Sequence, residues 1–354
     1  MTTLGEGGRP LRVAVVGVGA FGRNHLRVYR ELEQAGFPVR LAAAVDCDGD
    51  ALAAAAKYGV PGFRTMEDCL AAVGLDAASL CVPTVVHAEG ARTLLAAGID
   101  LLIEKPLAPS LAEADDIVRL ACELGRVVQV GHLERFNPAV RAVRALLDRP
   151  MFFEVHRLSV FTPRSLDVDV VLDLMIHDLD IVMSLVGAGA GNAVREVRAV
   201  GLPVLSGKVD IANVRLEFEN GCVANFTASR VSTERVRKMR FFQTHQYLSL
   251  DFARQDLLLI DVSAAAGKGQ AGLASAGAAL PDAAALGEHP TAGLSLRKIP
   301  VEAGEPLRLE ITAFLDAART RAQPEVTVED GRAALALALE INAAIASHAR
   351  RTGL

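Results

Sequence analysis

Residues 12–132 alternate short apolar runs with longer, Ala-rich stretches. The apolar runs are bounded by Gly, Pro or Asp and cover residues 12–19, 39–46, 77–83, 100–106 and 126–132. Between them lie segments of helical length, at residues 21–35, 50–58, 85–97 and 110–124. Continuously apolar strands separated by helices predict a parallel sheet covered on both faces. The carboxyl ends of its strands share one edge, and ligands bind at that edge in open α/β folds.

After residue 150 the pattern changes to consecutive strands, at residues 152–161, 194–200, 209–231 and 238–261. Asn220-Gly221 lies between two alternating runs and predicts a β-hairpin. We therefore expect an α+β domain with a mostly antiparallel sheet, and a last helix over residues 332–348. Residues 263–294 are rich in Ala and Gly and predict a flexible insertion.

Composition narrows the class of protein. The chain has 354 residues, of which 51% are hydrophobic and 22% charged, so it has enough apolar residues for a large core. Its 37 basic and 42 acidic residues leave no general basic footprint for nucleic acid. No apolar run reaches the roughly 18 residues of a membrane span, and nothing at the N-terminus marks export. We expect a cytoplasmic protein without nucleic-acid or membrane partners.

The five cysteines include no CxxC and no cluster with zinc spacing. An odd count at scattered positions indicates small buried or half-buried side chains rather than a disulfide framework. We predict no metal site.

The run VAVVGVGAFGRNH places Gly17, Gly19 and Gly22 in GxGxxG spacing, after a strand and at the start of a helix. Gly17 permits a tight turn, Gly19 lets backbone N–H groups approach a pyrophosphate, and Gly22 lets the helix and strand pack closely. The helix N-terminus then presents its positive dipole end to the phosphates. We predict a dinucleotide-binding Rossmann domain over residues 1–132, followed by the α+β domain over 133–354.

Asp46 ends the second strand, where a carboxylate accepts hydrogen bonds from ribose hydroxyls and repels a 2′-phosphate. This position favours NAD over NADP as the cofactor. Arg23 and Arg27 keep NADP open as the alternative.

Lys105 belongs to the EKP run at 104–106, which ends another strand of the predicted sheet. Its place on the edge that carries the cofactor would bring the side chain into the cleft. The alternative is a solvated surface lysine.

The segment 167–187 predicts a largely apolar helix with Asp169, Asp173, His177 and Asp180 within an arc of about 80°. Burying unpaired charge is costly, so this stripe requires an explanation. A metal site, a satisfied structural network and a catalytic acid/base stripe are the three alternatives. We favour the third, with Asp173 orienting His177.

GVGAFG, EKP and the Asp-x-x-x-His helix, in that order, resemble the glucose-fructose oxidoreductase / inositol dehydrogenase / rhizopine catabolism protein (Gfo/Idh/MocA) family. The stretch from Glu305 to Ile341 is similar to the family's closing segment. The resemblance implies that residues 133–354 form a substrate-binding and oligomerisation domain, whose open sheet builds a homodimer or homotetramer. It also implies that Lys105 contacts nicotinamide and substrate, and that Asp173 and His177 serve proton transfer. With the three glycines, Asp46 and Lys105, the expected cofactor-binding set comprises Ala20, Phe21, Pro83, Thr84, His87 and Glu104.

GHLERFNPAV (131–140) and DVDVVLDLMIHDLD (167–180) resemble one branch of the family. Members of that branch oxidise the 3-hydroxyl of UDP-N-acetylglucosamine on the way to a 2,3-diamino sugar of lipid A precursors. Arg135 and Asn137 are the expected contacts to a substrate hydroxyl or acetamido group. Five cations within residues 230–240 would suit a sugar diphosphate, or form a solvated strand face or an oligomer contact.

Together these features predict an NAD-dependent dehydrogenase acting on a secondary hydroxyl of a sugar, most specifically of a nucleotide sugar. One alternative is a polyol or monosaccharide dehydrogenase of inositol type. A second is a non-catalytic NAD-binding regulator on the same fold.

Overall fold

The computed structural model describes residues 9–162, 168–186, 193–261, 285–288 and 295–353. The chain divides into two compact units, and each is built from two separate segments. The first unit contains residues 1–133 and 305–335, and the second contains 134–304 and 336–354. The insertion predicted over 263–294 lies outside the described residues, apart from strand β14 (Ala285–Glu288).

The first unit contains a six-stranded sheet in the order β3-β2-β1-β4-β5-β6. All of its strand pairs are parallel, which confirms the predicted parallel sheet. Its strands are β1 (Leu11–Val16), β2 (Val39–Val45), β3 (Gly62–Phe63), β4 (Ala77–Leu80), β5 (Asp100–Glu104) and β6 (Val128–Gly131). The strand order reverses between β1 and β4, and a dinucleotide binds across that reversal in folds of this kind.

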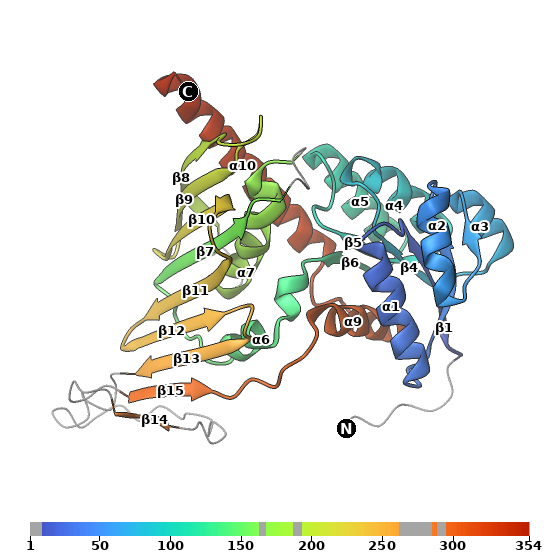
Figure 1. The fold of residues 1–354 in the computed structure, drawn as a ribbon, viewed down its shortest axis with the longest axis horizontal. Coiled ribbons are helices and arrows are strands. Elements are labelled where there is room, and N and C mark those ends of the chain that lie inside the picture. The colour runs from blue at the N-terminus through green and yellow to red at the C-terminus, as the bar shows by residue number, and fades with distance from the viewer. Residues whose placement is uncertain (1–8, 163–167, 187–192, 262–284, 289–294, 354) are drawn as a thin grey trace. The chain divides into compact units, whose positions relative to one another are not determined.

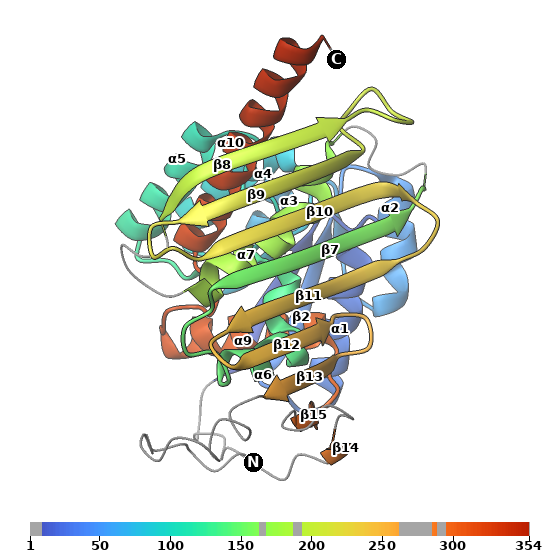
Figure 2. The same cartoon turned by 90° about the vertical axis from the view of Figure 1, so that its left-hand side faces the viewer.

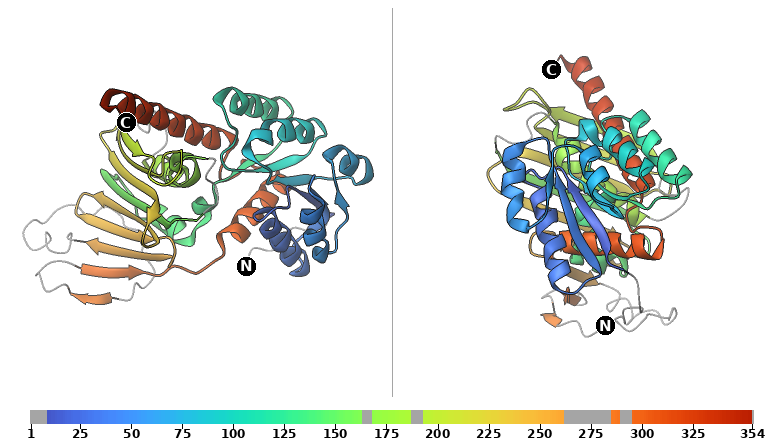
Figure 3. Two further views of the ribbon diagram at one scale, coloured as in Figure 1. Left: turned by 45° about the horizontal axis from the view of Figure 1, so that its top comes forward. Right: turned by 90° about the vertical axis from the view of Figure 1, so that its right-hand side faces the viewer.

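Helices cover both faces of this sheet. They are α1 (Gly22–Gln34), α2 (Gly49–Ala55), α3 (Met66–Ala72), α4 (His87–Ala96), α5 (Leu111–Glu123) and α9 (Pro306–Thr320). Helices α4 and α5 lie on one face, and α1 and α9 on the other (Figures 1 and 3). Leu307, Ile311, Phe314 and Leu315 of α9 join the core formed by β1, β2 and α1. The chain therefore returns to its first unit to complete that core. The hydrophobic pattern of the sequence does not predict strand β3 or helix α3.

The second unit contains a sheet in the order β14-β15-β13-β12-β11-β7-β10-β9-β8 (Figure 2). Every described strand pair is antiparallel except β7–β10. The strands are β7 (Phe152–Val160), β8 (Val194–Leu202), β9 (Ile211–Phe218), β10 (Val223–Ser232), β11 (Val236–Gln243), β12 (Gln246–Asp251), β13 (Asp256–Asp261), β14 and β15 (Ser295–Ile299). Gly221 has φ +83° between the paired strands β9 and β10, so the predicted hairpin is confirmed.

Alternate residues of these strands are buried, for example Phe153 and Val155 of β7. Helices α6 (Pro138–Arg144), α7 (Ile176–Val186) and α10 (Val328–Thr352) accompany this sheet. A π-helical turn over Val171–Met175 leads into α7, with the N–H of Ile176 bonded to the carbonyl of Val171. The uniform α-helix expected over 167–187 is therefore wrong in its first turns. Within the described residues, no helix is both long and apolar enough to span a membrane.

Candidate functional site

The glycine-rich turn between β1 and α1 has no room for side chains at two of its three glycines. Gly17 has φ +83°, and a Cβ atom there would lie 2.6 Å from the carbonyl carbon of Cys81. A Cβ atom at Gly22 would lie 1.8 Å from the carbonyl oxygen of Gly17. Gly19 faces open space, since a Cβ atom there would have no described neighbour within 4 Å. This is the cradle that a close-lying pyrophosphate requires.

Among the described residues, no side chain caps the N-terminus of α1, and its first turn holds no acidic residue. The amides of Arg23 and Asn24 donate to the carbonyls of Gly19 and Phe21, at 3.1 and 2.8 Å, so an anion would meet the positive dipole end of the helix. The expected contacts Ala20 and Phe21 are exposed at this end of the helix, with Phe21 at 41%.

A pocket of about 640 Å³ adjoins this turn within the first unit. Of the expected cofactor contacts it brings together Gly17, Gly19, Asp46 and Pro83. Asp46 is held in place by two backbone amides, with Val18 N–H donating at 2.8 Å and Asp48 N–H at 2.9 Å. The lining further includes Asp48, Arg64, Thr65 and Glu89, which sequence reasoning missed. Arg64 follows the two-residue strand β3, and no periodic signal could have placed it here.

The EKP run follows β5, and Lys105 is half-buried. His87, at the start of α4, is 1% exposed and supports this turn. Its Nδ1 lies 3.0 Å from the carbonyl oxygen of Pro106 and its Nε2 lies 2.9 Å from that of Val82. Burial lowers the pKa of His87, although these carbonyls act in the opposite direction. Backbone carbonyls thus lie within hydrogen-bond distance of both ring nitrogens of His87. Cofactor contacts from His87 and Thr84 stay predictions.

Glu104 lies at the end of a buried polar chain inside the first unit. His25 Nε2 is 3.1 Å from Glu104 Oε1, and His25 Nδ1 is 3.1 Å from Ser79 Oγ. Tyr29 Oη continues the chain at 2.8 Å from Ser79 Oγ. A Cβ atom at Gly131 would lie 2.8 Å from Glu104 Oε1, so the neighbouring strand leaves room for this carboxylate. These hydrogen-bonded side chains connect helix α1, which follows the glycine-rich turn, to strand β5, where the EKP run begins.

Glu310 on α9 is the most unusual carboxylate of the first unit. Its side chain is fully buried, and neither oxygen has a hydrogen-bond partner among the described residues. Burial, reinforced by the charge of Glu104, raises the pKa of Glu310 well above its ordinary value. We infer that Glu310 is a neutral acid at neutral pH, since a buried carboxylate without partners is costly.

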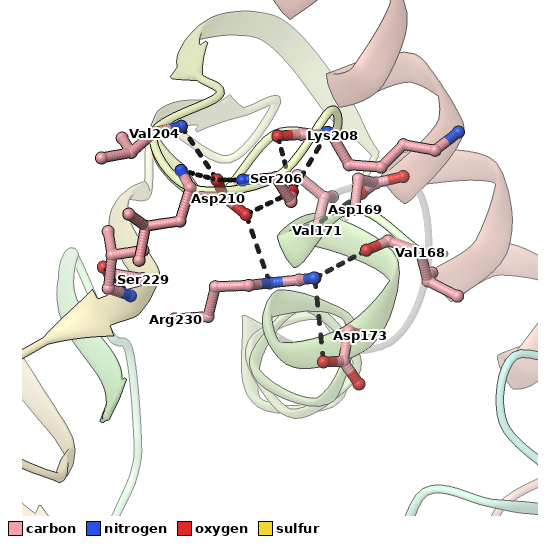
Figure 4. Close-up of polar contacts among 12 residues, drawn as sticks. Val168, Asp169, Val171, Asp173, Val204, Ser206, Lys208, Asp210, Ser229 and Arg230 are labelled. Carbon is pink, nitrogen blue, oxygen red and sulfur yellow. Dashed lines mark hydrogen bonds and ion pairs between the residues drawn. The ribbon is translucent and has the colours of Figure 1, made fainter. Parts of the chain in front are cut away.

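Asp173 and His177 lie in the second unit, at the π-helical turn and at the start of α7. The Asp173 side chain is 28% exposed, and His177 is half-buried. Arg230 Nη2 lies 3.8 Å from Asp173 Oδ2 (Figure 4). A partly exposed carboxylate and imidazole one turn apart can position and move a proton.

The other carboxylates near this helix are structural. Asp169 accepts hydrogen bonds from the amides of Val171 and Leu172, at 2.9 and 3.0 Å, and from Asn342 Nδ2 at 3.0 Å. Asp180 receives two bonds from Arg135, at 2.7 and 2.8 Å, and both side chains are buried. The predicted stripe is therefore divided between structural roles and the pair of Asp173 and His177.

The two expected substrate contacts also have other partners. Besides pairing with Asp180, Arg135 is only 5% exposed. Asn137 is 2% exposed, caps α6 through Ala139 N–H and donates to the carbonyl of Phe252 at 3.1 Å. Both residues thus have internal partners, and a substrate contact from either one stays a prediction.

The five cations of the basic cluster at 230–240 differ in exposure. Arg230 is buried, whereas Arg235, Arg237 and Lys238 are exposed. Arg240 pairs with Glu154 at 2.9 Å.

Comparison with known proteins places the chain in a family. Residues 11–132 match the Gfo/Idh/MocA oxidoreductase family, NAD-binding Rossmann fold, and residues 139–249 match a C-terminal domain of that family. The UDP-N-acetylglucosamine 3-dehydrogenase of Acidithiobacillus ferrooxidans is 39% identical over 249 residues, which are 70% of this chain and 76% of that protein. The chain belongs to the Gfo/Idh/MocA family. The predicted family, fold class and dehydrogenase assignment are thus confirmed.

A solved structure of the same enzyme and one further relative show how far the likeness extends. A solved structure of the Acidithiobacillus ferrooxidans enzyme has a TM-score of 0.82 at 33% identity, over 95% of this chain and 97% of that one. The inositol 2-dehydrogenase of Corynebacterium glutamicum (strain R) is 29% identical over 227 residues, 61% of this chain and 66% of that protein.

Glu310→Gln should change how stability depends on pH. The raised pKa means that the folded state holds a proton that the unfolded state releases. The free energy of unfolding of the wild type should therefore fall as pH rises above the ordinary Glu value of about 4.3, by up to ~1.4 kcal/mol per pH unit. Glu310→Gln should lack this component. Its midpoint of thermal unfolding should therefore rise relative to that of the wild type as the pH is raised from about 5 to 8.

The exposed Glu329 of α10 supplies the matched control, since Glu329→Gln should follow the wild-type pH dependence. Parallel curves for the wild type and Glu310→Gln would show that Glu310 is ionised in the folded protein.

Proposed function

We propose that this protein is an NAD-dependent dehydrogenase that oxidises the 3-hydroxyl of a nucleotide sugar such as UDP-N-acetylglucosamine, for a 2,3-diamino sugar of lipid A precursors. The observation that carries the proposal is the likeness to the Acidithiobacillus ferrooxidans enzyme, at 39% identity and with 97% of its solved chain covered. The presence of Lys105, Asp173 and His177 together favours an enzyme over a regulator, because binding NAD alone requires none of them.

The residues of the first unit fit an NAD molecule. The open space over Gly19 and the uncapped first turn of α1 suit a pyrophosphate. The Asp46 carboxylate would accept hydrogen bonds from the adenosine ribose and repel a 2′-phosphate. Since a dinucleotide extends across the reversal of strand order, its nicotinamide half would lie toward β4, β5 and Lys105.

The chemistry requires removal of a hydroxyl proton as a hydride leaves the same carbon. Bound NAD supplies the hydride acceptor. In our proposal His177 accepts the hydroxyl proton as general base, and Asp173 orients its imidazole. The Lys105 ammonium stabilises the developing alkoxide.

An inositol-type dehydrogenase is the second candidate. It is favoured by the 29% identity to the Corynebacterium glutamicum inositol 2-dehydrogenase. Both candidates share the cofactor and the proton-transfer residues, so only substrate turnover separates them.

The wild type should use NAD at least about tenfold more efficiently than NADP, a difference of ~1.4 kcal/mol. Asp46→Ser should narrow or invert this ratio of kcat/KM values, because the charge that repels a 2′-phosphate is lost. Asp48→Ser is the control, since Asp48 lines the same pocket and serine retains the cap of α2. Equal efficiency of the wild type with both cofactors would contradict the assignment.

Lys105→Ala and His177→Ala should each lower kcat by about 10²–10⁴, since each removes a group acting on the reacting oxygen. The Kd for NAD should stay within a few-fold, because neither residue is asked to hold the pyrophosphate. Lys57→Ala and His156→Ala, on exposed and half-buried positions elsewhere, should retain kcat. If His177→Ala keeps near-normal kcat from about pH 6 to 9, the base lies elsewhere.

The substrate assay should detect oxidation of UDP-N-acetylglucosamine and far poorer turnover of free N-acetylglucosamine. Contacts to the uridine diphosphate would position the ring without altering the reacting carbon. Because a 3-keto sugar is an unfavourable product with NAD, glutamate and a sugar aminotransferase are added and the amino-sugar nucleotide is followed by mass. No mass shift, alongside clear reduction of NAD with inositol, would establish the second candidate.

A further inference from the structure

Arg230 lies beneath the start of the helix that carries Asp173 and His177. Its side chain is 6% exposed, and its Nη2 donates to the carbonyl oxygen of Val168 at 2.7 Å. The same nitrogen lies 3.8 Å from Asp173 Oδ2, so the guanidinium contacts the π-helical turn and the residues that lead into it. Figure 4 shows the guanidinium between Asp173 and a second carboxylate, Asp210.

Asp210 fixes Arg230 from the opposite side. Its side chain is fully buried, with Oδ1 at 3.9 Å from Arg230 Nε, and its carbonyl accepts from the Arg230 amide at 3.0 Å. Asp210 Oδ2 also accepts from the amides of residues 204, 205 and 206 at 2.8, 2.7 and 2.7 Å. Burial works against this charge, but the Ser206 hydroxyl and these amides hold the pKa of Asp210 well below its usual range. Asp210 is thus a permanent anion.

The contacts of Arg230 differ from those of the arginines that serve the scaffold. Arg135 donates two hydrogen bonds to Asp180 and Arg157 donates two to Asp178, all at 2.7–2.8 Å. Arg230 lies at 3.8 and 3.9 Å from its two carboxylates, beyond hydrogen-bond distance. Its 2.7 Å bond goes to a neutral carbonyl, which an uncharged donor could satisfy equally. At 3.8 Å the positive charge acts on Asp173 through its electrostatic field, which is weakly screened because the guanidinium is buried.

The charged groups around Asp173 come from three elements. Asp169 and His177 flank it on its own helical segment, Arg230 approaches from β10, and Asp210 from the residue before β9. Asp169 is already bonded to two amides and to Asn342. Arg230 is a cation that lies near both Asp173 and Asp210.

We propose that Arg230 is a positioning residue for proton transfer: it fixes the Asp173 carboxylate and sets the electrostatic field in which His177 exchanges its proton. This inference rests on the proposed function in its assignment of Asp173 and His177 to proton transfer. Asp210 holds Arg230 in place and so belongs to the same unit.

Loss of the positive charge removes a cation beside Asp173, one helical turn from the imidazole. The negative charge of Asp173 would then favour protonated His177 more strongly, so the ring would become neutral, and able to accept a proton, only at higher pH. Arg230→Gln is the informative variant, because its amide can still donate to the Val168 carbonyl while the charge is absent. Arg230→Lys retains the charge and should rescue the wild-type behaviour.

The direct measurement is an NMR titration of the His177 imidazole without substrate, with its signal among the eight histidines assigned through His177→Asn. Arg230→Gln should move the titration midpoint up by about one pH unit. Arg230→Lys should leave it near the wild-type value, and so should Arg240→Met, the control on β11. An unchanged midpoint in a folded Arg230→Gln protein would overturn the inference.

Kinetics supply the second readout. Arg230→Gln should lower kcat at neutral pH by about tenfold to a hundredfold, with the KM for NAD within about threefold. In an Asp173→Asn background the same change should add little, since the carboxylate that Arg230 positions is gone. Full additivity would overturn the inference. If the wild type oxidises no sugar, the proposed function fails, and the NMR titration still decides the role of Arg230.

Discussion

The helix of Asp173 and His177 packs beside an apolar sheet face while carrying several carboxylates, so each buried charge must have a partner. Asp178 is held by Arg157 from β7 with two bonds of 2.7 Å, and Asp180 by Arg135. Removing one partner of such a pair leaves a buried charge that costs about 3–5 kcal/mol. These ion pairs fix the orientation of α7 about its own axis against the sheet. This orientation in turn decides that His177 is half-buried, with Asp173 partly exposed one turn before it.

The sequence predicts well those features that arise from short-range chemistry. Strand and helix periods identify the parallel sheet, and Asn220-Gly221 identifies the β9–β10 turn because few residues accept a positive φ there. The GxGxxG spacing anticipates the close approach of Gly22 to the Gly17 carbonyl. These signals operate over a few residues and need no knowledge of the rest of the chain.

Features that depend on distant partners are not predictable in this way. The pairing of Arg135 with Asp180, for example, becomes visible only when η3 (Leu133–Phe136) and α7 are packed. The π-helical turn depends on packing at its start and alters the angular spacing assumed for an α-helix. Likewise, nothing in the sequence around Glu310 indicates that its side chain is fully buried. In each case contacts with residues distant in the sequence override the local sequence pattern.

The return of α9 to the first unit has a consequence for biosynthesis. Ile311 and Phe314 belong to the same core cluster as β1 and β2, yet the ribosome makes them after the whole sheet of the second unit. The usual order, in which an N-terminal domain folds as it emerges, cannot be completed here. A nascent chain that ends before residue 305 exposes the core surface of α1 and the sheet that α9 later covers. The NAD-binding unit therefore completes its core among the last parts of the molecule to be made.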